Sequence, residues 1–136
     1  MVEDADMTDF VMTCSTGESN KYGLIVGHAY TLIGVKYVYD KSGRISNLLY
    51  EIRNPWGNDV YNGSWNDLDT KRWTKEAIKS VGFVNNTNDG IFHMEHTDFI
   101  HAFESLVISY YYDDADPNYL EVEDYDYTAK YFVIDF

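Results

Sequence analysis

The sequence predicts an α+β domain in which antiparallel β-structure dominates. Its 136 residues include 13 Tyr, 7 Phe and 3 Trp, and 45% of them are apolar. Aromatic and β-branched residues favour strands, and they occur here in short runs separated by turn-forming clusters. Only two stretches have the composition of short helices. A chain of this length buries roughly two-thirds of its unfolded surface on folding, so one hydrophobic core is expected.

Charge and composition exclude several classes of partner. The formal net charge of -13 repels phosphate backbones and anionic lipid headgroups, which makes nucleic acids and membrane surfaces poor partners. No stretch approaches the roughly 20 apolar residues of a membrane span, and residues 1–6 are acidic where a secretory signal would be basic and then apolar. The single cysteine, Cys14, excludes an internal disulfide. We therefore expect a cytoplasmic protein.

Two runs of strand-forming residues predict a β-hairpin. A short strand near residues 10–12 and a loop over 15–20 precede it. The first run covers residues 24–39 and contains glycines that predict bends in one long strand. Residues 40–43 form a turn signal, and residues 44–53 resume an extended apolar pattern.

The register of this hairpin decides how His28 and Asn54 lie relative to each other. With a turn of three or five residues, or an even turn with a one-residue bulge, His28 lies directly opposite Asn54 on one face. With an unbulged four-residue turn, the two residues lie on opposite faces. The sequence is compatible with both registers, which differ by a single residue.

The second half of the chain predicts shorter elements and a change of composition. In order, these elements are a loop over 58–73, a helix over 74–81 ended by Gly82, a strand over 91–95, a short helix capped by Thr97 and a strand over 106–112. Seven acidic residues between 113 and 126 leave no helical or strand pattern. We therefore expect one domain over 1–112, an acidic linker or loop over 113–129, and a further strand or a following domain starting in 130–136.

His28 and Asn54 have the residue types and surroundings of a proton-transfer pair. A thiol nucleophile needs a base that accepts its proton and a third group that orients the base. His28 follows Gly27, so its ring is approachable. Asn54 precedes Pro55, which favours an extended backbone, and Trp56, whose indole can cover the amide. A lone histidine in a strand is more often a packed or surface residue, so the wider context decides its role.

Five motifs provide that context between residues 23 and 108. They are Gly27-His28-Ala29-Tyr30, Arg53-Asn54-Pro55-Trp56-Gly57, Asn62-Gly63-Ser64-Trp65-Asn66-Asp67, Asp89-Gly90 followed by Phe92 and Met94, and Asp98-Phe99 with Phe103 and Leu106. In this order they resemble the second subdomain of the calpain catalytic core, a papain-like cysteine protease. The resemblance implies a mainly antiparallel β half-barrel with short helices. It implies an intracellular endopeptidase of the calcium-dependent type.

The resemblance also implies a role for each matching residue. His28 would be the general base that forms an ion pair with a thiolate, and Asn54 would orient its ring. Trp56 would shield the bond between them, and Gly27 would allow a peptide substrate to come close. A neighbouring imidazolium can lower a cysteine pKa from about 8.5 to roughly 3.5–7.5.

The family's nucleophilic cysteine lies in a first subdomain upstream, so the resemblance implies that this chain is inactive alone and needs that subdomain as a partner. Cys14 is a poor substitute, because it lies on a predicted strand with no helix N-terminus to lower its pKa. We expect a packed, inert thiol there. A calpain-like regulatory or scaffolding module without catalysis is the alternative, and an unrelated β-rich binding domain is a third.

Calcium is the one candidate cofactor. Members of the resembling family bind it in this subdomain through acidic side chains and a carbonyl, and the cation needs six to eight oxygens. Asp67 and Asp89 match two of the acidic positions, whereas Val60 and Ile91 occupy two others and offer no side-chain oxygen. We expect weak binding at most.

Other conspicuous residues have simpler interpretations. Trp65 and Trp73 are expected to anchor the core or a loop. His93, His96 and His101 suggest zinc, but they are divided between a predicted strand and a helix and have no cysteine ligand nearby. We expect no zinc site.

Overall fold

The computed structural model describes residues 11–19, 21–58, 60–110 and 130–136, which form one six-stranded antiparallel sheet and two short helices. The strands are β1 (Val11–Ser15), β2 (Ala29–Tyr39), β3 (Ile45–Arg53), β4 (Ile91–Glu95), β5 (Ser105–Tyr110) and β6 (Lys130–Asp135). The helices are α2 (Lys75–Val81) and α3 (His96–Ala102). The strand order across the sheet is β4-β3-β2-β1-β5-β6. The α+β class with a mainly antiparallel sheet is confirmed.

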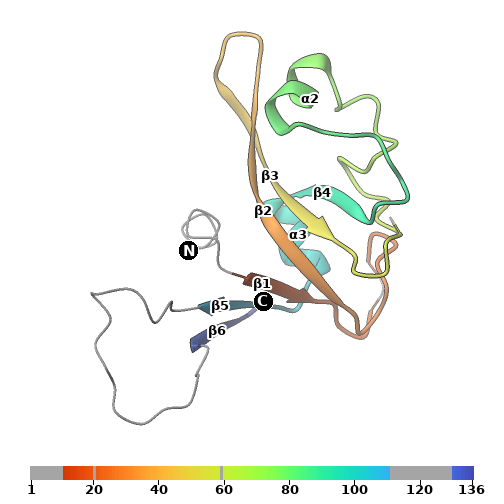
Figure 1. The fold of residues 1–136 in the computed structure, drawn as a ribbon, viewed down its shortest axis with the longest axis vertical. Helices are drawn as coiled ribbons and strands as arrows, with labels where there is room; N and C mark the ends of the chain where they lie inside the picture. Colours follow the sequence, from red (N-terminus) through yellow and green to blue (C-terminus); the bar gives the residue numbers. More distant parts are fainter. Residues whose placement is uncertain (1–10, 20, 59, 111–129) are drawn as a thin grey trace, which may run out of the picture.

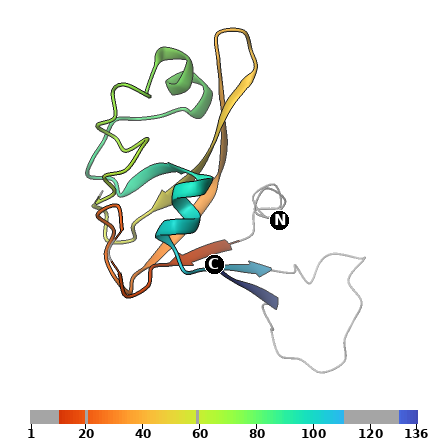
Figure 2. The same cartoon turned by 180° about the vertical axis from the view of Figure 1, so that it is seen from behind.

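The long hairpin of β2 and β3 is the central feature of the sheet. It runs past the short strands, and α2 lies beside its far end (Figure 1). The opposite view shows α3 in front of the sheet (Figure 2), where it packs against β3 and β4. Neither helix of the described residues is long and apolar enough to cross a membrane.

The predicted hairpin is present, but its register differs from direct opposition of His28 and Asn54. Thr31 pairs with Arg53 at this end of the hairpin. Extending the pairing by one residue puts Asn54 opposite Tyr30. His28, two residues before Tyr30, is then the diagonal neighbour of Asn54. The register shifts twice, between Leu32 and Gly34 and between Val38 and Tyr39. The second shift compensates for the first, so His28 and Asn54 still follow the same face.

The first strand of the hairpin is shorter than predicted. Residues 24–28 form a turn region, and β2 begins only at Ala29. The backbone has positive φ at Tyr22 (57°), Gly23 (77°) and Gly27 (60°), a conformation that a strand does not allow. Gly23 and Gly27 therefore mark a loop that leads into the strand, whereas Gly34 lies within β2 beside a register shift.

The two helices begin differently. Thr74 caps α2 by accepting a hydrogen bond from Ala77 N. Gly82 ends that helix with φ 71°, as the sequence predicts. The predicted cap at Thr97 is wrong, because α3 begins at His96 directly after β4 and Glu95 occupies the cap position without a side-chain cap. The Glu95 carboxylate is engaged elsewhere.

The buried side chains form two clusters. The larger lies between α3 and the sheet and contains Met12, Cys14, Leu24, Tyr30, Leu32, Tyr50, Ile52, Tyr61, Phe92, Met94, Phe99, Ala102, Phe103, Leu106 and Ile108. The smaller lies near α2 and contains Val38, Leu49, Trp65, Trp73, Ala77 and Val81. Trp65 and Trp73 are thus core residues, as expected. This smaller cluster packs α2 against the far end of the β2–β3 hairpin.

The chain beyond β5 is described only where β6 resumes. The predicted acidic linker or loop over 113–129 and the end of the strand predicted over 106–112 lie outside the described residues. The residues predicted to begin a further strand or a following domain form β6, which pairs with β5 at the edge of the same sheet.

A partly buried contact between His93 and Glu51 links β3 to β4. His93 Nε2 lies 3.0 Å from Glu51 Oε2, and the two residues face each other in the strand register. The His93 ring is also edge-on to Trp73 at 5.3 Å between centroids. The hydrogen bond from His93 lowers the pKa of Glu51, burial opposes this effect, and Lys36 lowers the pKa further.

This contact predicts a loss of stability in acid. A depressed carboxyl pKa stabilises the fold at pH values above the ordinary value of 4.5, and that contribution disappears as the pH falls through the depressed pKa. We expect Glu51→Gln to reduce the pH dependence of the unfolding free energy below about pH 4.5. Urea unfolding at several pH values tests this, and parallel curves for the two proteins would contradict it.

Candidate functional site

His28 and Asn54 meet where the hairpin strands end. His28 Nε2 lies 3.0 Å from Asn54 Oδ1, although the two residues are 26 positions apart in the chain. Each follows the inward-facing row of its strand, after Ile52 on one side and before Tyr30 on the other, and both of these residues are core members. Asn54 is 0% exposed and His28 is half-buried, so the pair lies at the edge of the core.

The surroundings of Asn54 fix which amide atom faces the ring. Its Nδ2 donates to Asn58 O at 2.9 Å, and its Oδ1 accepts from Trp56 N at 3.1 Å. The oxygen therefore faces His28, and an oxygen can only accept, so Nε2 carries the proton. Among the described residues, no group bonds to Nδ1 of His28. A ring held in this tautomer can accept a proton at Nδ1.

Trp56 covers the pair from the solvent side. Its indole lies 4.2 Å from the His28 ring between centroids, at an interplanar angle of 50°. The side chain is 67% exposed, which is unusual for a tryptophan and leaves one face of the indole open. Tyr30 contacts the imidazole edge-on, at 4.8 Å between centroids. Two aromatic side chains thus pack against the ring.

Gly90 supports Asn54 from β4's side. Asn54 N donates to Gly90 O at 2.8 Å, and Gly90 has φ +77°. A Cβ at this position would lie 2.7 Å from Asn54 O and 3.0 Å from the Cα of Gly57. Only glycine fits here, so the Asp89-Gly90 motif has a structural role that its sequence did not reveal.

Gly27 is the exposed residue before His28. Its φ is +60°, and a Cβ there would have no neighbour within 4 Å. The surface beside the ring is therefore open, with room for another chain to approach.

Comparison with known proteins identifies the family of this chain. The model of the family described as "Calpain family cysteine protease" matches residues 1–110. The chain belongs to the calpain family. Human calpain-14 is 36% identical over 98 residues, covering 70% of this chain and 14% of calpain-14. Human calpain-9 is 36% identical over 104 residues, covering 73% of this chain and 15% of calpain-9.

A nematode relative also matches. Calpain clp-1 of Caenorhabditis elegans is 35% identical over 89 residues, covering 63% of this chain and 11% of that protein. The chain therefore spans between 11% and 15% of the length of these three calpains. It belongs to a family of cysteine proteases while spanning a small part of its relatives.

Cys14 does not have the environment of a reactive thiol. It is 0% exposed within the larger core cluster, and its Sγ is 3.7 Å from Tyr30 O. Burial raises the pKa of its thiol strongly, which favours the unreactive neutral form. The sequence had predicted such a packed thiol.

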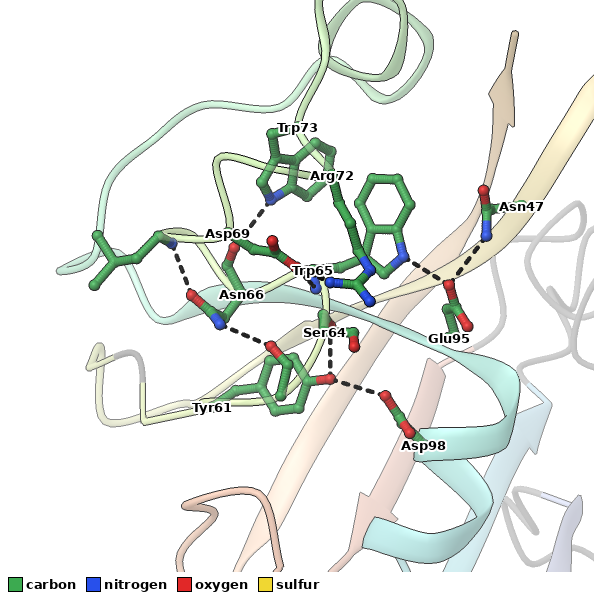
Figure 3. A network of polar contacts seen from close by, with 12 residues as sticks. Asn47, Tyr61, Ser64, Trp65, Asn66, Asp69, Arg72, Trp73, Glu95 and Asp98 are labelled. Atoms are coloured by element: carbon green, nitrogen blue, oxygen red, sulfur yellow. Dashed lines mark hydrogen bonds and ion pairs between the residues drawn. The ribbon is translucent and has the colours of Figure 1, made fainter.

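The loop that carries Asp67 is held by a polar network (Figure 3). Trp65 N donates to Asp69 Oδ2 at 2.8 Å, and Trp65 Nε1 donates to Glu95 Oε1 at 2.8 Å. Asn47 Nδ2 donates to the same Glu95 oxygen at 3.0 Å. This explains why Glu95 does not cap α3. It also lets the backbone of Trp65 keep a positive φ of 70°.

The residues expected to bind calcium do not form a metal cluster in the described part of the chain. No group of three or more His, Cys, Asp or Glu side chains there could hold a metal ion. Asp67 is buried, and Asp89 Oδ1 accepts from Ile91 N at 2.8 Å. Val60 packs against the larger core cluster. These donors alone do not fit a cation that needs six to eight oxygens.

The three remaining histidines have separate environments. His93 pairs with Glu51, and His96 Nδ1 lies 2.8 Å from the hydroxyl of Tyr50. His101 is exposed at the end of α3. Among the described residues, none of the three belongs to a group of three or more His, Cys, Asp or Glu side chains that could hold a metal ion.

The close approach at Gly90 gives a prediction about stability. We expect Gly90→Ala to destabilise the fold by about 2–4 kcal/mol, because it combines an unfavourable positive φ with a clash against Asn54. Gly43 is the matched control, since its φ is +80° but nothing lies within 4 Å of a Cβ there. Gly43→Ala should cost only about 1–2 kcal/mol. Urea unfolding measures both, and equal losses would contradict the packing argument.

Proposed function

We propose that this chain supplies the general base of a calpain-type cysteine endopeptidase. His28 is the base, Asn54 orients it, and the nucleophilic cysteine comes from an upstream subdomain that packs against this one. The observation that carries the proposal is the 3.0 Å contact between His28 Nε2 and Asn54 Oδ1, with Nδ1 left able to accept a proton. Without the cysteine subdomain this chain has no peptidase activity.

The proposed reaction uses the ring twice. His28 Nδ1 takes the thiol proton, and the thiolate attacks the carbonyl carbon of a peptide bond. The ring then gives its proton to the leaving amine, so an acyl-enzyme forms. In the second half, His28 takes a proton from water, which attacks the acyl group and releases the acid and the thiol.

Two neighbours contact the ring that carries the proton between these steps. Asn54 Oδ1 accepts from Nε2, and the Trp56 indole presents its π-system at 4.2 Å from the ring. The indole also keeps water from the hydrogen bond. Gly27 is exposed and has no side chain, which suits close approach of a substrate backbone.

A reducing compartment suits this chemistry. A thiol nucleophile must stay reduced, and we propose the cytoplasm as the protein's location. The net charge of -13 supports protein substrates over nucleic acid.

We expect the base to control labelling of the nucleophile. In the full-length protein, a thiol-reactive peptide inhibitor should label the upstream cysteine. His28→Ala should slow this labelling roughly 30-fold or more, because an unpaired thiol with a pKa of about 8.5 is only a few per cent ionised at pH 7. Asn54→Ala should slow it less. Labelling rates are measured by mass spectrometry.

His101→Ala is the matched control, since His101 is exposed on α3 and lies outside the proposed site. It should label like the parent protein. Equal labelling of the parent and His28→Ala proteins would contradict the assigned base. An upstream segment that contains no labelled cysteine would instead support an inactive regulatory or scaffolding module.

We propose that calcium, if this segment uses it, acts through Asp67 and Asp89 and binds no more tightly than millimolar. Two carboxylates fall short of the oxygens that the ion requires, and Val60 and Ile91 add none through their side chains. Isothermal titration at calcium concentrations up to about 1 mM should give no heat beyond dilution. A saturable signal that Asp67→Asn and Asp89→Asn abolish would contradict this expectation.

A further inference from the structure

Thr16 holds the backbone of the turn that carries His28. It follows β1 directly and is 7% exposed. Its backbone N donates to His28 O at 3.0 Å, and its Oγ1 accepts from His28 N at 2.9 Å. One side chain and one backbone amide thus contact both polar backbone groups of the histidine.

The hydroxyl proton of Thr16 has two acceptors within reach. Oγ1 lies 2.6 Å from Ile25 O and 3.2 Å from His28 O. A hydroxyl has one proton, and the shorter contact is the stronger, so Oγ1 donates to Ile25 O. It accepts from His28 N at the same time. The hydroxyl therefore bridges the two ends of the turn formed by residues 25–28.

Among the residues that the structure describes, no other side chain bridges the two ends of this turn. Tyr30 binds only one end, where its hydroxyl accepts from Ile25 N at 3.0 Å. Gly27 N donates to Gly17 O at 2.9 Å, which fixes the middle of the turn but involves backbone alone. Gly27 itself is exposed, so packing does not hold the turn from outside.

We propose that Thr16 is a positioning residue for His28. It does not touch the imidazole, and it acts by fixing the backbone from which the ring projects toward Asn54. The inference rests on the proposed function, because it assigns Thr16 to the same base. The sequence predicts only a loop over residues 15–20 and does not indicate this role for Thr16. The contact joins the residue that follows β1 to His28, 12 residues further along the chain.

Three variants of the full-length protein test the inference. Thr16→Val removes the hydroxyl and keeps the shape, and Thr16→Ser keeps the hydroxyl. Thr13→Val is the matched control, because Thr13 lies on β1 three residues before Thr16, and no hydrogen bond of its hydroxyl is found among the described residues. All are assayed well below the melting temperature of the least stable variant.

We expect Thr16→Val to lower kcat roughly 10- to 100-fold with KM changed less than about twofold, since a small misplacement of a catalytic group has effects of this size. Thr16→Ser should recover kcat to within about threefold of the parent, and Thr13→Val should match the parent. Equal kcat in Thr16→Val and Thr13→Val would overturn the inference. So would a loss in Thr16→Ser as large as in Thr16→Val.

A second measurement does not depend on peptidase activity. Hydrogen exchange of the His28 amide and the ¹H–¹⁵N signal of its Nε2 proton should both change in Thr16→Val and stay unchanged in Thr13→Val. If the parent protein cleaves no peptide, the proposed function fails, and these signals still decide whether Thr16 positions the ring. Unchanged signals would overturn the inference even if the protease is active.

Discussion

The hydrogen bond between His28 and Asn54 depends on how β2 pairs with β3. Each strand directs alternate residues to one face, so an odd register shift would put the imidazole and the carboxamide on opposite sides of the sheet. The hairpin contains two shifts, one near the turn and one at Ile33. Because these shifts compensate each other, the two side chains arrive at the same edge of the core. The bulge at Ile33 is thus a condition for the site and not an irregularity of the strand.

The site is built from backbone contacts contributed by distant parts of the chain. Thr16 reaches the turn before β2, and Gly90 accepts from the backbone of Asn54 after β3. Both contacts bring short irregular segments onto a rigid sheet. This arrangement favours a preorganised ring, because the rigid strands fix the positions of the loop residues that form the site. Its open side lies next to Gly27, where a Cβ would have no neighbour within 4 Å.

Trp65, which belongs to the third sequence motif, has an architectural role here. Trp65 adopts a positive φ and donates through both its backbone and its indole, to Asp69 and Glu95. These contacts fix the loop between β3 and α2, and they use the carboxylate that would otherwise cap α3. The same loop carries Asp67, which is buried.

The sequence by itself determined the fold class, the presence of the hairpin, the helix that ends at Gly82, and the choice of His28 and Asn54 as candidate partners. These features depend on local patterns: alternation of apolar residues, turn formers, and the preference of Gly82 for a positive φ. Only the tertiary structure decided the register, the late start of β2, the start of α3, and the supporting roles of Thr16 and Gly90. Each of these depends on contacts between residues far apart in the chain, and their free energies are set by packing that no local pattern specifies.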